Sequence, residues 1–340
     1  MLEKPALPDE RIIACLREQY GLSVGRVEFL PIGADSDTAV YRAETVDATP
    51  CFVKLRREFD PSAVLLPKAL SDDGIEAIIA PLPTGNGALW ADIAPFTLVL
   101  YPFIEGRNGF EVEMTASYWR ELGAALRRIH EAEIPPALAA GVPRETYSPR
   151  WRDGVRRFLG DIERQTYDDP VAAELAAYLR LKRPVIGDLV ERAERHAAML
   201  MARPPAPVLC HSDVHAGNVL IDPDDHLYIV DWDQPIFAPK ERDLMYPGGA
   251  QGFTGHTPEE EEALFYEGYG PAEVDAVALA YYRAERIIED IAVYCYELLL
   301  SDAGGADREQ SLAYVKLNFV EGGTIERAWP PFVNGVKLRS

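Results

Sequence analysis

The feature that most restricts the fold of this sequence is a change in apolar spacing near residue 115. Before it, short apolar stretches alternate with turn-rich pieces, a pattern that predicts strands. After it, apolar residues recur at helical spacing, beginning with Trp119, Leu122, Leu126 and Ile129. One strand-rich segment, 208–230, interrupts the helical part. We therefore expect an α+β protein with a small β-rich N-terminal part, 1–104, and a larger, mainly helical C-terminal part, 105–340.

The expected elements follow from this patterning. Strands are predicted at Val27–Leu30, Thr38–Ala43, Cys51–Leu55, Ala88–Ile93 and Thr97–Phe103, then at Val208–Cys210, Val219–Ile221 and Leu227–Val230. A leading helix should be capped by Asp9, and a second helix by Thr115. Further helices are predicted at Val155–Ile162, Val171–Leu181, Val185–Met201, Glu259–Tyr266, Val274–Leu300 and Ser311–Glu321. Pro61 and Pro67 weaken the case for a regular helix after the third strand.

The charge of the chain argues against two classes of partner, and the alternative is that the acidic residues only keep the protein soluble. The chain has 34 basic and 55 acidic residues and a net charge of −21, which repels nucleic acid and anionic membrane surfaces and attracts cationic ligands. No apolar signal-peptide core or membrane-length apolar run is present, so we expect a cytoplasmic protein. The cysteines are scattered, which predicts core thiols of a reducing compartment instead of disulfides or a zinc site: Cys15, Cys51, Cys210 and Cys295.

Polar side chains gather in the strand-rich segment. Asp213 and Asn218 lie five residues apart on a predicted loop, and Asp231 follows Asn218 by thirteen residues. A strand, a tight turn and a return strand would bring Asn218 and Asp231 to one end of a hairpin, beside Asp213. Phosphoryl transfer needs this inventory: one carboxylate on the acceptor hydroxyl, and an amide oxygen and a carboxylate on Mg²⁺. The alternative is that these are only turn-forming residues.

These residues resemble the His-x-Asp-(x)4-Asn loop and the Asp-x-x metal motif of the aminoglycoside phosphotransferase family, which has a protein-kinase-like, two-lobed fold. The resemblance implies that Asp213 orients the acceptor hydroxyl and takes its proton. It implies that Asn218 and Asp231 hold Mg²⁺, and that His211 braces the loop. His215 is left without a chemical role.

The resemblance also assigns the nucleotide side. Lys54 matches the lysine that neutralises the α- and β-phosphates of ATP. Gly33, Ser36 and Asp37 stand in the nucleotide loop, which lacks GxGxxG, and Pro102, Phe103 and Ile104 lie where the family pairs with adenine. The lysine normally pairs with a glutamate on the small lobe's helix. Only Glu58 and Asp60 are near that place, so the partner of Lys54 is left unassigned.

Longer strings narrow the resemblance to the aminoglycoside 9-phosphotransferase branch, which phosphorylates spectinomycin: Tyr101–Ile104, Tyr147–Arg152, Ala238–Met245, Phe265–Gly270 and Glu289–Tyr294. ATP-dependent phosphorylation of a cationic aminocyclitol is therefore expected, at the 9-hydroxyl of spectinomycin, with resistance to the drug as its result. Trp232, Glu289 and Tyr294 are candidate substrate contacts, because a carboxylate beside an aromatic ring suits a protonated amine. The alternative is that Val293 and Tyr294 pack inward while Glu289 pairs with Arg286.

Three other functions remain open. The chain could be a metabolic kinase of a choline-like, amino-sugar or other cationic alcohol. It could instead be a metal-dependent hydrolase using His211, Asp213 and His215, although zinc sites usually need further ligands. The third is a catalytically silent nucleotide-binding module. The presence of Lys54, Asp213, Asn218 and Asp231 argues against it. The oligomeric state and the choice of ATP over GTP are not predicted.

Overall fold

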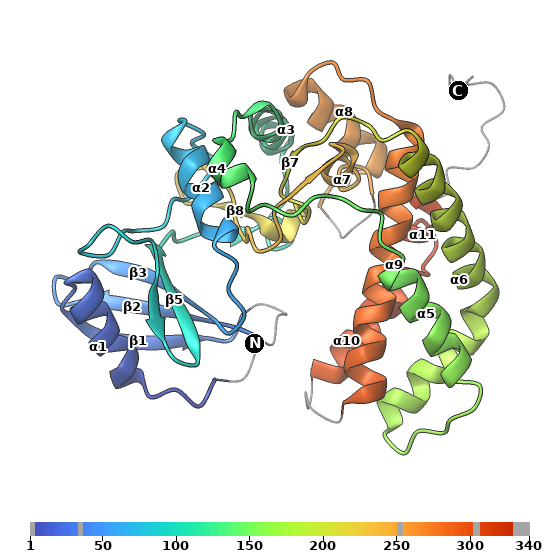
Figure 1. The fold of residues 1–340 in the computed structure, drawn as a ribbon, viewed down its shortest axis with the longest axis horizontal. Helices are drawn as coiled ribbons and strands as arrows, with labels where there is room; N and C mark the ends of the chain where they lie inside the picture. The colour runs from blue at the N-terminus through green and yellow to red at the C-terminus, as the bar shows by residue number, and fades with distance from the viewer. Residues whose placement is uncertain (1–3, 33–36, 250–253, 302–306, 329–340) are drawn as a thin grey trace. The chain divides into compact units, whose positions relative to one another are not determined.

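The computed structural model describes residues 4–32, 37–249, 254–301 and 307–328 (Figure 1). Its contacts group the chain into two compact units, each assembled from separate stretches of sequence. The first unit comprises Met1–Glu113, Ala124–Pro143 and Ala216–Pro235, and the second comprises Met114–Gly123, Arg144–His215 and Ile236–Ser340. This grouping places the predicted hairpin with the β-rich N-terminal part. The lobe boundary at residue 104 remains a prediction.

The first unit is built on a five-stranded antiparallel sheet in the order β1-β2-β3-β5-β4. Its strands match the predicted ones, although the fourth is shorter than expected: β1 Val24–Leu30, β2 Thr38–Thr45, β3 Pro50–Arg56, β4 Ala91–Ile93 and β5 Phe96–Pro102. Alternate residues of β3 are buried, namely Cys51, Val53 and Leu55. The pleat therefore presents Lys54 and Arg56 together on the face opposite this core.

Helix α1, Asp9–Tyr20, packs Ile12 and Leu16 into the core of the first unit. The helix lies against the sheet (Figure 1). The predicted Asp9 cap is wrong, because Asp9 is the first helical residue and Pro8 is the N-cap, without a side-chain bond. A carboxylate in the first turn still suits the helix dipole, and here Asp9 pairs with Lys4 at 2.7 Å.

A helix does form after β3, contrary to the expectation from its prolines. Helix α2 spans Ser62–Asp72, with Pro61 at its N-cap and Pro67 inside it. The carboxylate of Asp60 accepts a hydrogen bond from the backbone N–H of Ser62, which satisfies one donor of the first turn. Buried residues along the helix, among them Val64 and Leu66, supply the packing that offsets the prolines.

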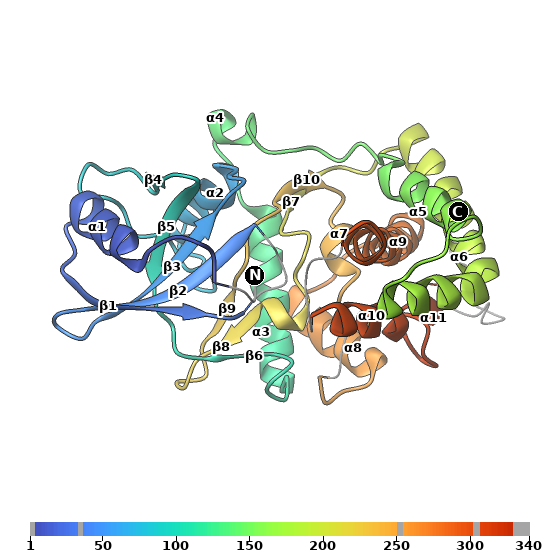
Figure 2. The ribbon, with the colours of Figure 1, turned by 90° about the horizontal axis from the view of Figure 1, so that it is seen from below.

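A second sheet of the first unit carries the predicted hairpin. Strands β8, Val219–Ile221, and β9, Leu227–Ile229, are antiparallel, and β6, Arg107–Asn108, pairs with β8. A 3-10 turn, η1, Ala216–Asn218, leads into β8, and the three strands lie together in Figure 2. Helix α3, Ala116–Glu131, contributes to both units, and α4 spans Pro136–Ala139. The predicted Thr115 cap is confirmed, because its hydroxyl accepts from the N–H of Tyr118.

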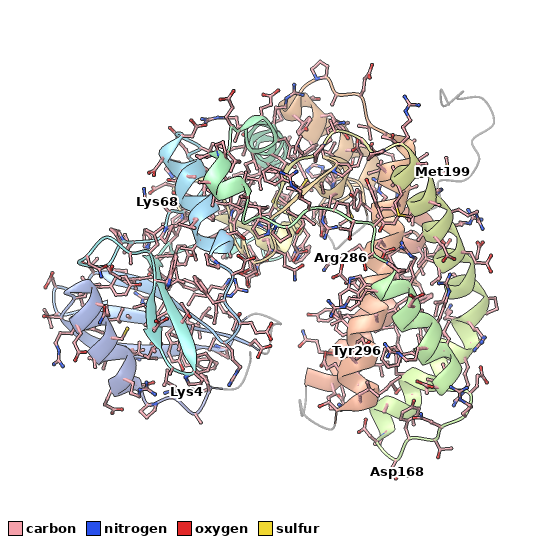
Figure 3. The ribbon with its side chains drawn as sticks, viewed as in Figure 1. Lys4, Lys68, Asp168, Met199, Arg286 and Tyr296 are labelled. Atoms are coloured by element: carbon pink, nitrogen blue, oxygen red, sulfur yellow. The ribbon has the colours of Figure 1, made fainter. Side chains whose placement is uncertain are left out.

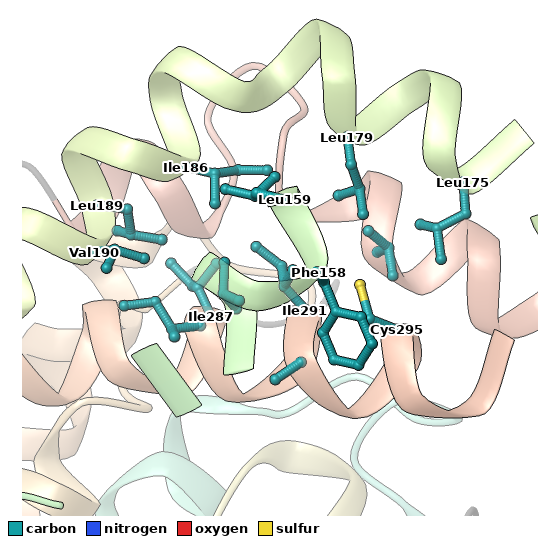
Figure 4. Packing of buried hydrophobic residues seen from close by; sticks show 14 of the residues in the cluster. Phe158, Leu159, Leu175, Leu179, Ile186, Leu189, Val190, Ile287, Ile291 and Cys295 are labelled. Carbon is teal, nitrogen blue, oxygen red and sulfur yellow. The ribbon is translucent and has the colours of Figure 1, made fainter. Parts of the chain in front are cut away.

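The second unit is mainly helical. Its core joins α5, Arg150–Asp161, α6, Pro170–Ala202, and α9, Ala276–Leu300, as Figure 4 shows with Phe158, Leu179 and Ile291. The other elements are β7 Val208–Cys210, β10 Ile236–Ala238, α7 Glu241–Leu244, α8 Pro258–Tyr269, α10 Asp307–Leu317 and α11 Thr324–Ala328. Strands β7 and β10 pair antiparallel. Asp275 caps α9 by accepting from two backbone N–H groups.

Two helices were predicted where the structure has one, because α6 continues through Pro184. Proline in a helix costs about 3 kcal/mol. Leu175 and Leu179 before it and Ile186 and Leu189 after it all enter the same core. Each such burial is worth about 1.5–3 kcal/mol, so together they outweigh the proline.

Two global expectations concern membranes and thiols. In the part of the chain that the structure describes, no helix combines the length and apolar character that a membrane crossing requires. The four cysteines are buried and not joined in disulfides, as their scatter predicted.

Candidate active site

Lys54 and Arg56 meet two carboxylates from the segment after β9. The Lys54 ammonium lies 2.6 Å from Asp231 and 2.7 Å from Asp233, and the Arg56 guanidinium lies 2.7 Å from Asp233. All four residues belong to the first unit. Burial alone would lower the pKa of Lys54, but the two carboxylates outweigh it and hold that pKa above its ordinary value. Lys54 is therefore a permanent cation.

The hairpin places Asn218 and Asp231 together, as predicted. Val219 pairs with Ile229, and the backbone N–H of Val230 donates to the carbonyl of Asn218 at 2.9 Å. Asp231 follows directly, with a φ of 66°. This left-handed backbone is unfavourable for aspartate, and such strain is found at functional sites.

The donor set at this end of the hairpin fits a magnesium ion. Asn218 offers an amide oxygen and Asp231 a carboxylate, the oxygen ligands that Mg²⁺ prefers. Asn218 is buried, whereas the Asp231 side chain is 46% exposed and can be reached by an ion. An ion bound there would compete with Lys54 for the Asp231 carboxylate.

Asp213 lies in the second unit, on a loop whose backbone N–H groups donate hydrogen bonds to the side chains of Asp243 and His211. The N–H groups of His211 and Ser212 donate to the buried Asp243 carboxylate at 2.9 and 2.6 Å. The N–H of Asp213 donates to Nδ1 of His211 at 3.2 Å, and His211 is completely buried. Ser212 has a φ of 72°. His211 therefore braces the loop, which agrees with the role implied by the resemblance.

Three side chains approach one oxygen of the Asp213 carboxylate. The Arg286 guanidinium lies 2.8 Å from Oδ1, the Tyr246 hydroxyl 3.0 Å and the His215 Nε2 3.7 Å. Burial would raise the pKa of Asp213, but Arg286, then the two histidines and Tyr246, lower it below its ordinary value. Asp213 is consequently an ionised hydrogen-bond acceptor.

Helix α9 carries a second carboxylate to the same guanidinium. Arg286, labelled on this helix in Figure 3, donates to Asp290 at 3.0 Å. The alternative in which Glu289 pairs with Arg286 is not found: among the described residues Arg286 pairs with Asp213 and Asp290. Glu289 nevertheless contributes negative charge around Arg286. The face that includes Arg286, Glu289 and Asp290 is thus acidic overall.

The other candidate substrate contacts are placed differently from each other. Trp232, in the first unit, is 5% exposed, and its indole N–H donates to the carbonyl of Ile229. Tyr294 is partly buried against the helical core of the second unit, and its ring centroid lies 6.2 Å from that of Tyr314. Their role in substrate binding remains a prediction.

The predicted nucleotide contacts lie along the first sheet. Pro102 ends β5 opposite Cys51, Phe103 lies under the Arg42 guanidinium at 4.8 Å, and Ile104 is partly buried. Asp37 lies 3.5 Å from Arg57. Gly33 and Ser36 fall outside the described residues.

Some site residues were not predicted from the sequence. Asp233 pairs with Lys54, Tyr246 and Arg286 bind Asp213, Asp290 binds Arg286, and Asp243 fixes the loop. The repeated aspartate in Asp231-Trp232-Asp233 was the available signal for Asp233. The hydrolase alternative loses its basis, because among the described residues His211, Asp213 and His215 do not form a group that could hold a metal ion.

Comparisons with known proteins identify relatives of the whole chain. A family model described as the phosphotransferase enzyme family matches residues 28–246. Protein StrN of Streptomyces griseus is 30% identical over 227 residues, which cover 64% of this chain and 67% of StrN. A crystal structure of spectinomycin phosphotransferase, APH(9)-Ia, in complex with ADP and spectinomycin is 37% identical with a TM-score of 0.89, over 96% of this chain and 99% of that one. The AMP-bound complex of APH(9)-Ia is 36% identical with a TM-score of 0.84, over 95% of this chain and 98% of that one.

Proposed function

This chain belongs to the phosphotransferase enzyme family and is a small-molecule kinase, and we propose that it transfers the γ-phosphoryl group of ATP to the 9-hydroxyl of spectinomycin. The similarity to APH(9)-Ia, which extends over almost the whole of both chains, carries the proposal for the substrate. The acidic face of α9 beside Asp213 also supports this proposal, because spectinomycin is a compact dication and opposite charges attract.

Asp213 has the properties that the acceptor side of the reaction requires. Its carboxylate is ionised, so it can accept a hydrogen bond from the substrate hydroxyl and take the proton as the new oxygen–phosphorus bond forms. The bond between the γ-phosphorus and the oxygen of ADP breaks in the same transfer. Because the transition state is loose, positioning matters more than basicity, and a lowered pKa is compatible with this role.

The first unit supplies the groups for the nucleotide. Lys54, held as a cation, would bind the α- and β-phosphates, and Asn218 and Asp231 would hold Mg²⁺. The metal supplies charge neutralisation of the phosphate oxygens. Asp213 and Asn218 are five residues apart in the chain, so the loop that carries the base continues into the hairpin that carries the metal ligands.

The test is a phosphorylation assay with ATP and Mg²⁺ on spectinomycin, kanamycin and choline, followed by mapping of the phosphorylated product. We expect turnover of spectinomycin at its 9-hydroxyl and little turnover of the other two. Kanamycin is more cationic than spectinomycin, so its rejection must come from the shape of the site. Preferred turnover of choline or an amino sugar would replace the substrate while leaving the kinase in place. A raised spectinomycin tolerance in cells expressing the chain would support a role in resistance.

The role of Asp213 is tested with Asp213→Asn, a variant that keeps the size of the side chain but not its charge. We expect kcat to fall about 100-fold or more, because a positioned proton acceptor contributes at least that much. ADP binding should be nearly unchanged. A variant that retains most of its kcat would remove Asp213 from the chemistry.

A further inference from the structure

The lysine that would bind the nucleotide phosphates has an unusual source of negative charge. Among the described residues, Lys54 pairs with Asp231 and Asp233 and has no ion pair with Glu58 or Asp60. The acidic residue of helix α2, Asp72, does not pair with Lys54 either; its carboxylate pairs with Lys68 at 2.5 Å. Both partners of Lys54 therefore come from the segment that follows the hairpin.

The two carboxylates are not equivalent. The Asp231 side chain is 46% exposed and pairs with Lys54 at 2.6 Å. The Asp233 side chain is 21% exposed and accepts from both Lys54 and Arg56, each at 2.7 Å. Two cations thus share Asp233, and hydrogen bonds between charged groups of this kind are about twice as strong as neutral ones.

The proposed metal site makes this difference important. If Asp231 gives its carboxylate to Mg²⁺, Asp233 is the carboxylate that remains to hold Lys54. The side chains of Lys54 and Arg56 also project from the same face of β3, because the two residues are two positions apart in the strand.

Building on the proposed function, we propose that Asp233 is a positioning residue that holds Lys54 and Arg56 as a paired cationic site for the nucleotide phosphates. It takes the place of a carboxylate on the small helix. The two cations and two carboxylates of this cluster are neutral overall. Engagement of Asp231 by a metal leaves the two cations with one carboxylate, that of Asp233, between them. The net positive charge that results favours a polyphosphate anion.

The experiment measures ADP binding by calorimetry, with EDTA and then with Mg²⁺, for the wild-type protein and for Asp233→Asn. The substitution removes a negative charge, so simple electrostatics predicts tighter binding of metal-free ADP. Our proposal predicts weaker binding of metal-free ADP instead, because without the Asp233 carboxylate Lys54 would remain paired with Asp231. We expect metal-free ADP to bind about tenfold more weakly to Asp233→Asn, the size of effect expected for a lost hydrogen bond between charged groups. Unchanged or tighter binding overturns the proposal and points to Asp233 as a metal ligand.

Two further variants complete the test. Asp231→Asn should not weaken metal-free ADP binding, but it should raise the Mg²⁺ concentration needed for activity. Asp233→Glu, which keeps the carboxylate, should recover much of the ADP affinity, and it also serves if Asp233→Asn does not fold. Failure of Asp233→Glu to bind better than Asp233→Asn would count against the proposal. A wild-type protein that binds no ADP would remove the proposed function together with this inference.

Discussion

At the scale of single residues, the Arg286 guanidinium lies between two carboxylates, 2.8 Å from Asp213 and 3.0 Å from Asp290. Burial raises the pKa of Asp290 to about 6; Arg286 opposes this shift, while Glu289 and Asp213 add to it. The pKa of Asp213 is lowered instead. Asp213 thus stays ionised across the neutral range, whereas Asp290 takes up a proton as the pH falls through about 6.

This difference predicts a pH-dependent affinity for a cationic acceptor. The KM for spectinomycin should rise as the pH falls through about 6, because the acidic face loses one charge. Asp290→Asn should raise this KM at neutral pH by about three- to tenfold and remove the inflection. Glu289→Gln, which removes a charge of the same sign from the same helix, should raise KM and keep an inflection, moved to lower pH because Glu289 helps to raise the pKa of Asp290. An unchanged pH profile in Asp290→Asn would contradict the assignment.

The same shift predicts the sign of a stability change. The pKa of Asp290 in the folded protein lies above its ordinary value of 3.8. Its contribution to stability is therefore fully present below pH 3.8 and is lost as the pH rises through about 6. Asp290→Asn should accordingly raise the thermal unfolding temperature at neutral pH, a measurement that needs no substrate.

Residues that act through local spacing could be predicted from the sequence, and residues that act through distant contacts could not. Asn218 and Asp231 were placed together because a hairpin fixes their register. The pairs Lys54–Asp233 and Asp213–Arg286 were not predicted, since their members lie 179 and 73 residues apart in the chain. No periodicity of the sequence encodes such pairings.

At the scale of elements, α6 continues for 33 residues although Pro184 lies inside it. A proline inside a helical pattern predicts the end of a helix, because proline removes a backbone donor. The helix continues because residues on both sides of Pro184 are buried in the same core. Strand positions were predicted better than helix ends, because β-type alternation is visible over a few residues while caps such as Pro8 depend on the local backbone.

Replacing this proline provides a test of that balance. Pro184 is exposed, and Pro184→Ala restores the donor to the carbonyl of Arg180, so we expect a gain in unfolding free energy of about 1–3 kcal/mol. Pro170→Ala is the matched control, since Pro170 occupies the first turn, where no donor is needed. Denaturant unfolding of the two variants measures the difference. Equal effects would mean that Pro184 imposes no cost.

At the scale of the whole molecule, the net charge of −21 acts on every ligand that approaches. Raising the ionic strength from about 10 to 100 mM shortens the screening length from roughly 30 to 10 Å. We expect the KM for spectinomycin to rise several-fold over this range with little change in kcat, because attraction of a dication is screened. The KM for ATP, an anion, should not rise in parallel. A parallel rise would indicate a general effect of salt on the protein.

The division of the chain into units has a consequence for its synthesis. The first unit includes Ala216–Pro235, so Lys54 leaves the ribosome 177 residues before Asp231 exists to pair with it. At about 5–20 residues per second, this delay lasts roughly 10 to 35 s. During that time Lys54 and Arg56 are two cations on the face of an emerging sheet, without the carboxylates they bind in the finished protein. The charge of these two side chains is therefore balanced by Asp231 and Asp233 only after the hairpin has been made.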